Sequence, residues 1–233
     1  MSKLMIAVLF GGCSPEYGVS LQSAAAVLQH MDHSRYEPVM VGISQAGDWF
    51  RYTGPVDSIE NDTWYSAETC VPAFMCPNRS APALLVFGPE GMQKVRLDAS
   101  FPVLHGRNGE DRTVQGLLEL AGVPLVGCGV LASALCMDKD HTHKLAQAAG
   151  VAVPRSAVLE RWMGVTVAMA EGETLGYPLF VKPVRAGSSY GITKVVERDQ
   201  LPAALELAFA YDDHVILEEA GAVDKAAPKP PKI

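Results

Sequence analysis

The hydrophobic and polar positions of this chain alternate between short apolar runs and segments with apolar residues at helical spacing. Residues 4–10 and 39–43 are apolar runs bounded by polar or turn-forming residues, which predicts two buried strands. Between them, residues 19–31 carry apolar side chains at helical spacing, which predicts a helix with Ser14 or Ser20 as its N-cap. The three segments together predict a β-α-β unit with parallel strands.

The pattern continues through the middle of the chain with one gap. It predicts a short strand at residues 49–53 and a hairpin at residues 84–97 around a Gly-Pro-Glu-Gly turn. It also predicts a further strand at residues 101–104 and a helix at residues 114–121 that is closed by Gly122. Residues 55–80 are rich in Pro, Ser, Asn and Asp and show no clear period, so they predict no element.

The remainder of the chain predicts a second domain. A helical pattern over residues 131–149 has a break near Met137. The pattern that follows predicts a helix at residues 202–209 and four strands, at 157–160, 179–181, 193–196 and 215–217. We therefore expect an α/β chain with an N-terminal open parallel-sheet domain at residues 1–137 and a second domain at 138–222. Residues 223–233 contain three Pro and three Lys, which predicts a flexible tail.

Composition and charge narrow the class of protein. The chain has 233 residues, 48% hydrophobic and 19% charged, which is typical of a folded protein with a sizeable core. The formal net charge of −7 argues against nucleic acid or an anionic membrane as a partner. An anionic substrate would therefore need a local basic site, for which Lys139, Lys182 and Arg185 are candidates.

The cysteines and the apolar runs indicate a cytoplasmic protein. There are five cysteines, an odd number, without a C-x-x-C pair or zinc-site spacing. The chain starts without a signal-peptide pattern, and no apolar run approaches the roughly 20 residues of a membrane-spanning helix. A reducing cytoplasm is the simplest location for such a chain.

Residues 179–191, L-F-V-K-P-V-R-A-G-S-S-Y-G, are the most informative segment. A buried strand ends at Lys182, and a Gly-rich loop with Ser188 and Ser189 follows. Loop N–H groups and hydroxyls can converge on phosphate oxygens beside a fixed ammonium group, which predicts a triphosphate clamp distinct from a Walker loop. The alternative is a Gly/Ser hairpin beside a surface lysine.

Two further turns follow predicted strands. Residues 11–20, G-G-C-S-P-E-Y-G-V-S, place Glu16 at the carboxyl edge of the sheet, where it could bind an ammonium group or merely favour the helix N-terminus. Cys13 is a weaker candidate as a nucleophile, because no base lies beside it. Residues 105–116, H-G-R-N-G-E-D-R-T-V-Q-G, place His105 at a strand end, either as a donor to a substrate carboxylate or phosphate or as an ordinary surface histidine.

Other polar residues carry weaker signals by themselves. Lys139 opens a predicted helix and could reach a nucleotide phosphate, and Glu218 at a strand end could face an adenine. Either could equally be a solvated side chain. The other histidines lack comparable context and are interpreted as structural or solvated, at positions 30, 33, 141, 143 and 214.

Taken in order, four motifs resemble the D-alanine–D-alanine ligase family of ATP-grasp enzymes, over residues 5–220. They are G-G-C-S-P-E-Y-G-V-S, H-G-R-N-G-E-D, M-D-K and V-K-P-V-R-A-G-S-S-Y-G. The wording F-G-G-C-S-P-E-Y, S-A-L-C-M-D-K-D and K-P-V-R-A-G-S-S is most similar to the vancomycin-resistance branch, especially its D-alanine–D-serine ligases. The resemblance implies that the second domain is the N-terminal part of an ATP-grasp domain.

The resemblance also implies an activity. ATP with Mg²⁺ phosphorylates the carboxylate of D-alanine, and the amine of a second D-amino acid displaces the phosphate, which supplies a dipeptide for peptidoglycan. Such chemistry depends on positioning and charge neutralisation. A homodimer is the family expectation.

Residue roles follow by the same resemblance. Glu16 would hold the ammonium of D-alanine, Ser188 would hydrogen-bond Glu16, and His105 would lie near the substrate carboxylate. The phosphates of ATP would be bound by Lys139, Lys182 and the loop with Ser188 and Ser189, and the adenine pocket would be lined by Glu218 and the backbone near Ala220.

The chain departs from the family pattern in two places. Arg112 stands where the family's H-G-x-x-G-E-D-G loop has its last Gly, and it would be strained if that position needs a positive φ. The family also continues for over a hundred residues beyond Glu219, with its Mg²⁺ ligands there, and Lys225 stands where a ribose-binding Glu is expected. We therefore assign no metal ligand in this chain, expect a C-terminal part to be missing, and expect the 233 residues alone to be catalytically deficient.

Two rival functions stay open from the sequence. One is a non-catalytic remnant that binds nucleotide or D-alanine. The other is an ATP-grasp ligase that joins a different carboxylate to an amine, which Glu16 and the H-G-x-x-G-E-D loop disfavour. A Rossmann dehydrogenase is more distant, because G-x-G-x-x-G is absent from the sequence.

Overall fold

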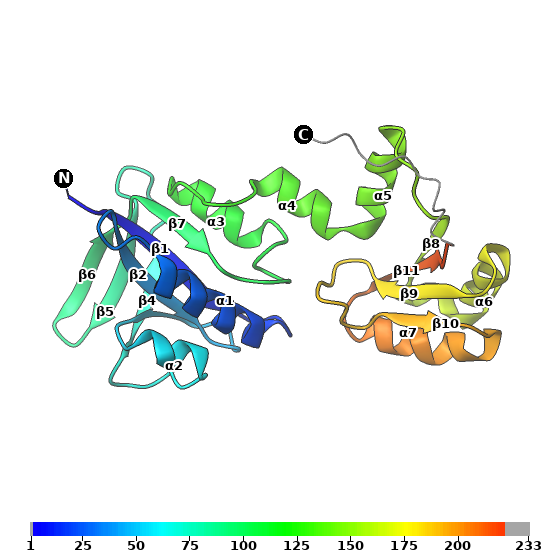
Figure 1. The fold of residues 1–233 in the computed structure, drawn as a ribbon, viewed down its shortest axis with the longest axis horizontal. Helices are drawn as coiled ribbons and strands as arrows, with labels where there is room; N and C mark the ends of the chain where they lie inside the picture. Colours follow the sequence, from blue (N-terminus) through cyan, green and yellow to red (C-terminus); the bar gives the residue numbers. More distant parts are fainter. Residues whose placement is uncertain (1, 222–233) are drawn as a thin grey trace. The chain divides into compact units, whose positions relative to one another are not determined.

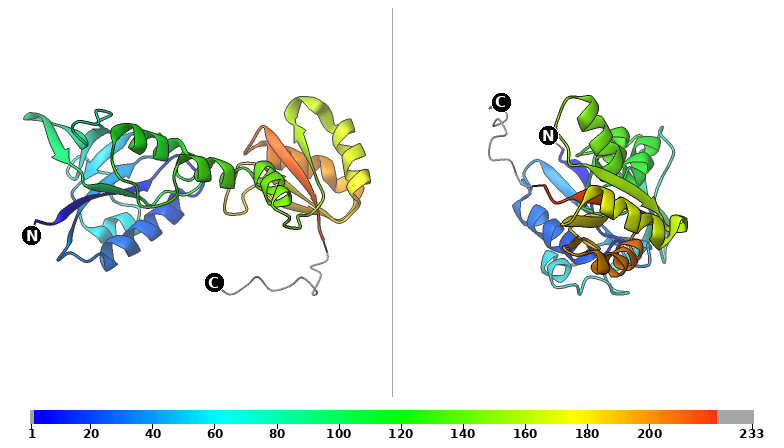
Figure 2. Two further views of the ribbon diagram at one scale, coloured as in Figure 1. Left: turned by 90° about the horizontal axis from the view of Figure 1, so that it is seen from above. Right: turned by 90° about the vertical axis from the view of Figure 1, so that its right-hand side faces the viewer.

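The computed structural model describes residues 2–221 (Figure 1). The chain divides into two compact units, Met1–Met137 and Asp138–Ile233, which are shown from two further directions in Figure 2. Each unit is described by itself below. The predicted tail at 223–233 and Lys225 lie outside the described residues.

The first unit is built on a seven-stranded mixed sheet with the order β6-β5-β4-β3-β2-β1-β7. The strands are β1 Leu4–Gly11, β2 Tyr36–Ile43, β3 Trp49–Tyr52, β4 Cys70–Met75, β5 Ala83–Gly88, β6 Gly91–Arg96 and β7 Ala99–Pro102. Strand β1 pairs in parallel with β2 and β7, whereas every other pairing in this sheet is antiparallel. The parallel strands therefore occupy one end of the sheet.

The predicted β-α-β unit is confirmed, although its helix starts earlier than expected. Helix α1 (Tyr17–His30) connects the parallel strands β1 and β2, and its N-cap residue is Glu16. The prediction of Ser14 or Ser20 as N-cap was wrong, because both hydroxyls serve tertiary contacts. Ser20 Oγ accepts the Gly11 N–H at 2.9 Å and donates to the Val103 carbonyl.

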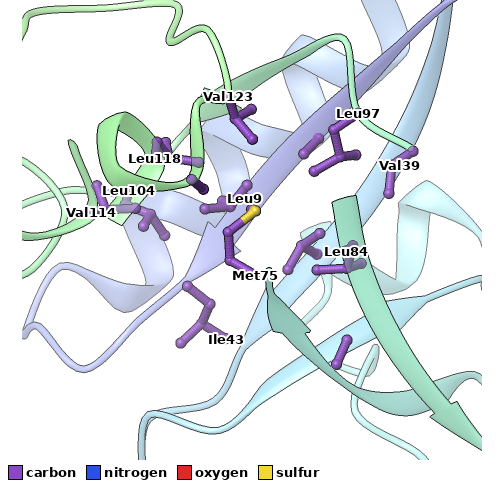
Figure 3. Close-up of a cluster of buried hydrophobic side chains, with 14 of the residues drawn as sticks. Leu9, Val39, Ile43, Met75, Leu84, Leu97, Leu104, Val114, Leu118 and Val123 are labelled. Carbon is purple, nitrogen blue, oxygen red and sulfur yellow. The ribbon is translucent and has the colours of Figure 1, made fainter. Parts of the chain in front are cut away.

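Two hydrophobic clusters cover the two faces of the first sheet, as the alternation along β1 requires. Ala7 and Leu9 pack toward α3 (Thr113–Ala121) in the cluster of Figure 3, whereas Val8 and Phe10 pack toward α1 and α2 (Val56–Glu60). In Figure 1, α1 and α2 accordingly lie on one face of the sheet and α3 on the other. This packing fixes the ends of β1 and β7, where the candidate residues lie.

The hairpin and the Gly122 helix end are confirmed. Strands β5 and β6 pair with Gly88 opposite Gly91, and Gly122 ends α3 with a φ of 69°. The predicted strand at 101–104 ends earlier, at Pro102. The segment 55–80 contains two elements that the pattern did not predict, α2 and β4.

The second unit is an antiparallel sheet of order β10-β9-β11-β8 with helices on one face. Its strands are β8 Ser156–Glu160, β9 Leu179–Pro183, β10 Thr193–Val195 and β11 His214–Glu219, all at the predicted places. Helices α6 (Gly164–Leu175) and α7 (Leu201–Phe209) pack on the face that carries Leu179, Val181, Val215 and Leu217. The opposite face is therefore free to carry polar residues of β9 and β11.

The predicted break in the helical pattern after Met137 is confirmed. Helix α4 (Val130–Met137) ends the first unit, and α5 (Lys139–Ala148) begins the second. Asp138 lies between them as the N-cap of α5, and its side chain accepts the His141 N–H at 2.9 Å. An Asp at this position satisfies a donor that the first turn of a helix otherwise leaves unpaired.

Two observations concern the described chain as a whole. All five cysteines lie in the described part of the chain and are free. Within residues 2–221, the structure contains no helix with both the length and the apolar character needed to cross a bilayer.

Candidate active site

One candidate site lies within the first unit, at the carboxyl ends of β1 and β7. Glu16 is only 4% exposed. Ser14 Oγ accepts the Glu16 N–H at 3.1 Å and donates to the His105 carbonyl at 2.7 Å, so it ties the two loops together. A Cβ placed on Gly106 would lie 1.8 Å from Glu16 Oε2, which means that the carboxylate packs directly against the glycine backbone. The structure thus brings Glu16 to the His105–Gly106 loop.

The loop that carries His105 is braced by its own acidic residues. Glu110 Oε2 accepts the Gly106 N–H at 2.8 Å, and Asp111 accepts two further loop N–H groups at 2.9 and 3.1 Å. His105 Nε2 lies 3.2 Å from Ser23 Oγ on α1, and its ring is half-buried. Glu110 and Asp111 therefore shape the loop, and the His105 ring is fixed at the strand end.

Arg112 has a positive φ, the condition under which the sequence predicted strain at this position. It is the N-cap residue of α3, with φ 88° and ψ −17°, in the left-handed region. A side chain in this region is disfavoured because its Cβ crowds the backbone, and Gly avoids that cost. Arg112 is thus a strained position in this loop.

A cavity of about 510 Å³ opens beside this loop within the first unit. His105, Glu110 and Gln115 line it together with the 125–128 loop and α4. Gln115 is 7% exposed, and its Nε2 donates to the Gly109 carbonyl at 2.7 Å, whereas its Oε1 has no hydrogen-bond partner among the described residues. Sequence reasoning missed Gln115, although a glutamine on an apolar helix face was a usable signal.

A second candidate site lies within the second unit, on the sheet face opposite α6 and α7. Lys182 pairs with Ile216 across β9 and β11, and Glu218 pairs with Phe180, so Lys182 and Glu218 share this face. Lys182 Nζ donates to Glu218 Oε1 at 2.5 Å, and both side chains are largely buried. The two residues predicted to bind different parts of a nucleotide therefore contact each other directly.

Lys139 on α5 donates hydrogen bonds to backbone carbonyls at the end of β9 and just after it. Its ammonium group donates to the carbonyls of Pro183, Val184 and Ala186, at 3.0, 3.3 and 2.7 Å. Burial lowers the pKa of Lys139, and the nearby Lys182 ammonium lowers it further. Lys139 therefore braces the start of the Gly/Ser loop, and a phosphate would have to compete with carbonyls for it.

The Gly/Ser loop contains two serines with positive φ, and an ion pair lies beside it. Ser188 and Ser189 are both exposed and have positive φ values of 45° and 62°. Arg185 beside the loop forms a bidentate pair with Asp212, at 2.6 and 3.1 Å. Burial alone would raise the pKa of Asp212, but hydrogen bonds from Arg185 and from the His214 N–H outweigh it and hold the pKa below its usual value. Asp212 is a second residue that sequence reasoning missed.

His143 is a third residue that sequence reasoning missed. Its Nε2 lies 3.5 Å from Glu218 Oε2, and its buried Nδ1 has no hydrogen-bond partner within residues 2–221. Its position four residues after Lys139, on the same face of α5, was the available signal. Ala220 directly follows β11, and its N–H donates to the Pro178 carbonyl at 3.1 Å.

The described residues fit a nucleotide better than a metal ion. Two ammonium groups, a buried carboxylate and a Gly/Ser loop supply the donors and acceptors that phosphates and a purine require. Asp138, Asp140 and His141 form the one group in the described part of the chain whose ligand atoms lie within 4.8 Å of one another. Asp138 already bonds His141, and Asp140 pairs with Lys144 at 2.6 Å, so we assign no metal to them.

The fold places the chain in the ATP-grasp class of α/β proteins. A family model described as the D-ala D-ala ligase N-terminus matches residues 5–128, and one described as the D-ala D-ala ligase C-terminus matches residues 145–225. The chain therefore belongs to the D-alanine–D-alanine ligase family. The expected fold class is confirmed, with the qualification that the first sheet is mixed and not wholly parallel.

The relatives include a D-alanine–D-alanine ligase, a vancomycin-resistance protein and a D-Ala:D-Ser ligase. The chain is 42% identical over 226 residues to a D-alanine–D-alanine ligase from Caldicellulosiruptor bescii, and 40% identical over 220 residues to the vancomycin B-type resistance protein VanB from Enterococcus faecalis. Each match covers 94% of this chain but 61% of the relative. The solved VanG D-Ala:D-Ser ligase from E. faecalis is 48% identical, with a TM-score of 0.85, and the match covers 95% of this chain and 64% of that one.

Proposed function

We propose that the protein acts as an ATP-dependent ligase that joins D-alanine to a second D-amino acid, D-alanine or D-serine, for peptidoglycan. The observation that supports this most strongly is the placement of the buried Glu16 carboxylate against the Gly106 backbone, within a chain of the D-alanine–D-alanine ligase family. Because the chain spans about 61% of the length of its curated relatives, the activity is proposed for the protein to which these 233 residues belong.

In this proposal the first unit binds D-alanine. The Glu16 carboxylate pairs with the substrate ammonium, because a buried carboxylate gains most from a cation that it can hold at close range. His105 lies on the neighbouring loop after β7 and contacts the substrate carboxylate. Residues 1–137 then form a substrate-binding domain.

The second unit binds ATP in this proposal. Lys139 and Lys182 neutralise phosphate charge, Ser188 and Ser189 contribute loop donors, and Glu218 with the Ala220 backbone faces the adenine. When bound, ATP with Mg²⁺ supplies the phosphoryl group that activates the D-alanine carboxylate. Residues 138–222 then form the N-terminal part of an ATP-grasp domain, and a cytoplasmic homodimer completes the proposal.

Glu16→Gln tests the proposal, because it keeps the side chain's shape while removing its charge. Calorimetric titration of the 233-residue chain with D-alanine, L-alanine and ADP should show D-alanine binding at least tenfold weaker in the variant, a loss of about 1.4 kcal/mol. Binding of ADP should be unchanged. The control is Glu37→Gln, at an exposed residue paired with Lys3, which should affect neither ligand.

The outcomes separate the proposal from its rivals. Equal loss of D-alanine and ADP binding would indicate misfolding, and unchanged D-alanine binding would refute the role of Glu16. An assay of ADP release with ATP, Mg²⁺ and D-alanine, with and without D-serine, measures turnover. Turnover would exclude a non-catalytic binding protein and would contradict the expectation that these 233 residues are catalytically deficient. Preference for carboxylates other than D-amino acids would favour another ligase of this class.

A further inference from the structure

Helix α5 presents two side chains to the polar face of the second sheet, one helical turn apart. Lys139 uses its ammonium group on three backbone carbonyls, so its charge serves the loop after β9. His143, four residues later, lies with Nε2 3.5 Å from Glu218 Oε2. The face of α5 that covers Glu218 therefore carries the Lys139 ammonium group, which is hydrogen-bonded to the backbone, and the His143 imidazole ring.

Glu218 depends on a single strong cationic partner in this structure. It is 9% exposed, and its Oε1 is 2.5 Å from Lys182 Nζ. The charged or titratable groups in contact with it are Lys182 on β9 and His143 on α5, and Lys139 lies near enough for its charge to be felt. Loss of one partner of a buried ion pair is costly because it leaves the other charge uncompensated.

Nucleotide binding would create such a loss. This step rests on the proposed function, in which Lys182 binds a phosphate. A single ammonium group that turns toward a phosphate weakens its 2.5 Å contact with Glu218. The group placed to replace it is the His143 ring, whose Nε2 lies 3.5 Å from Glu218 Oε2 and whose Nδ1 is buried without a hydrogen-bond partner in the described chain.

We propose that His143 is a positioning residue that takes over the Glu218 carboxylate, as an imidazolium, when Lys182 turns to a nucleotide phosphate. The imidazole gains one proton from the buffer, and no other bond is made or broken. Glu218 then stays in place to face the base. Phosphate binding is consequently coupled to proton uptake, whereas binding of a nucleoside without phosphate is not.

Calorimetry of ADP binding in buffers with different ionisation enthalpies measures this coupling directly. With the 233-residue chain slightly above neutral pH, the observed enthalpy should rise with the buffer's ionisation enthalpy, with a slope equal to the protons taken up. The slope should vanish for adenosine and for His143→Gln. The control is His141→Gln, an exposed histidine on the same helix that pairs with Asp138, which should keep the slope.

Each outcome of the titrations either supports or refutes the proposed role of His143. A zero slope for ADP with the unmodified chain, or an unchanged slope in both His143→Gln and His143→Asn with intact circular dichroism, would overturn the role of His143 while ADP binding itself stands. Complete absence of ADP binding would instead refute the proposed nucleotide site, and the inference with it. A purely structural histidine would change affinity or stability without changing the slope.

Discussion

Ser20→Ala is expected to destabilise the first unit strongly, although serine to alanine is a small change. Ser20 is fully buried, and its hydroxyl both accepts the Gly11 N–H at 2.9 Å and donates to the Val103 carbonyl. Alanine would leave two buried backbone groups unsatisfied, at about 1–3 kcal/mol each. We therefore expect a total loss of about 2–6 kcal/mol, a large fraction of the 5–15 kcal/mol that is typical of a domain.

Equilibrium urea unfolding followed by tryptophan fluorescence is a suitable assay. Trp64 in the first unit is 1% exposed, whereas Trp162 in the second unit is 77% exposed, so the signal is dominated by unfolding of the first unit. The Gly11 amide should also exchange faster with deuterium in the variant. Ser34→Ala, at an exposed serine, should change the unfolding free energy by less than about 0.5 kcal/mol.

The reasoning would be refuted if Ser20→Ala lowered the unfolding free energy by less than about 0.5 kcal/mol and left deuterium exchange at the Gly11 amide unchanged. A buried N–H group without a hydrogen bond costs more free energy than that. Such a result would mean that the Ser20 hydroxyl does not hold the two loops that carry Glu16 and His105.

Three further predictions concern strained and charged positions. Arg112→Gly removes a side chain at φ 88° and should stabilise the first unit by about 0.5–1 kcal/mol in thermal unfolding; destabilisation would contradict this. Gly106→Ala should displace Glu16 and abolish D-alanine binding by calorimetry while ADP binding persists; retained D-alanine binding would be evidence against the site. Asp212 has a pKa held below its usual value, so it stabilises the fold above pH about 4 and loses this contribution as pH falls further. Asp212→Asn should flatten that acid dependence in pH-dependent unfolding, and an unaltered pH profile would rule the explanation out.

Much of the fold could be predicted because its strands are short and strongly apolar. Residues 4–10 make up most of β1, residues 179–181 are the first part of β9, and the break after Met137 separates α4 from α5. The segment 55–80 could not be predicted, because α2 is only five residues long and β4 contains a proline. Helix α6 was also not predicted, and its sequence mixes β-branched residues with glycine, which weakens a helical signal.

The candidate site was predictable where a motif follows a strand directly. Glu16, His105 and Lys182 each lie at or just past a strand end, and the structure places Glu16 beside the His105–Gly106 loop and Lys182 beside Glu218. Residues whose importance arises from contacts between distant segments could not be predicted in this way. Ser20 bridges two loops and His143 meets Glu218 from a helix, and neither relation leaves a local pattern in the sequence.

The most direct test of the central claim is ATP binding by the 233-residue chain, measured by calorimetry for the unmodified protein and for Lys182→Gln, with Lys94→Gln on the edge strand β6 as control. The account predicts that ATP binds, that Lys182→Gln weakens binding at least tenfold with circular dichroism unchanged, and that Lys94→Gln has no effect. Absence of ATP binding, or binding that does not depend on Lys182, would contradict it.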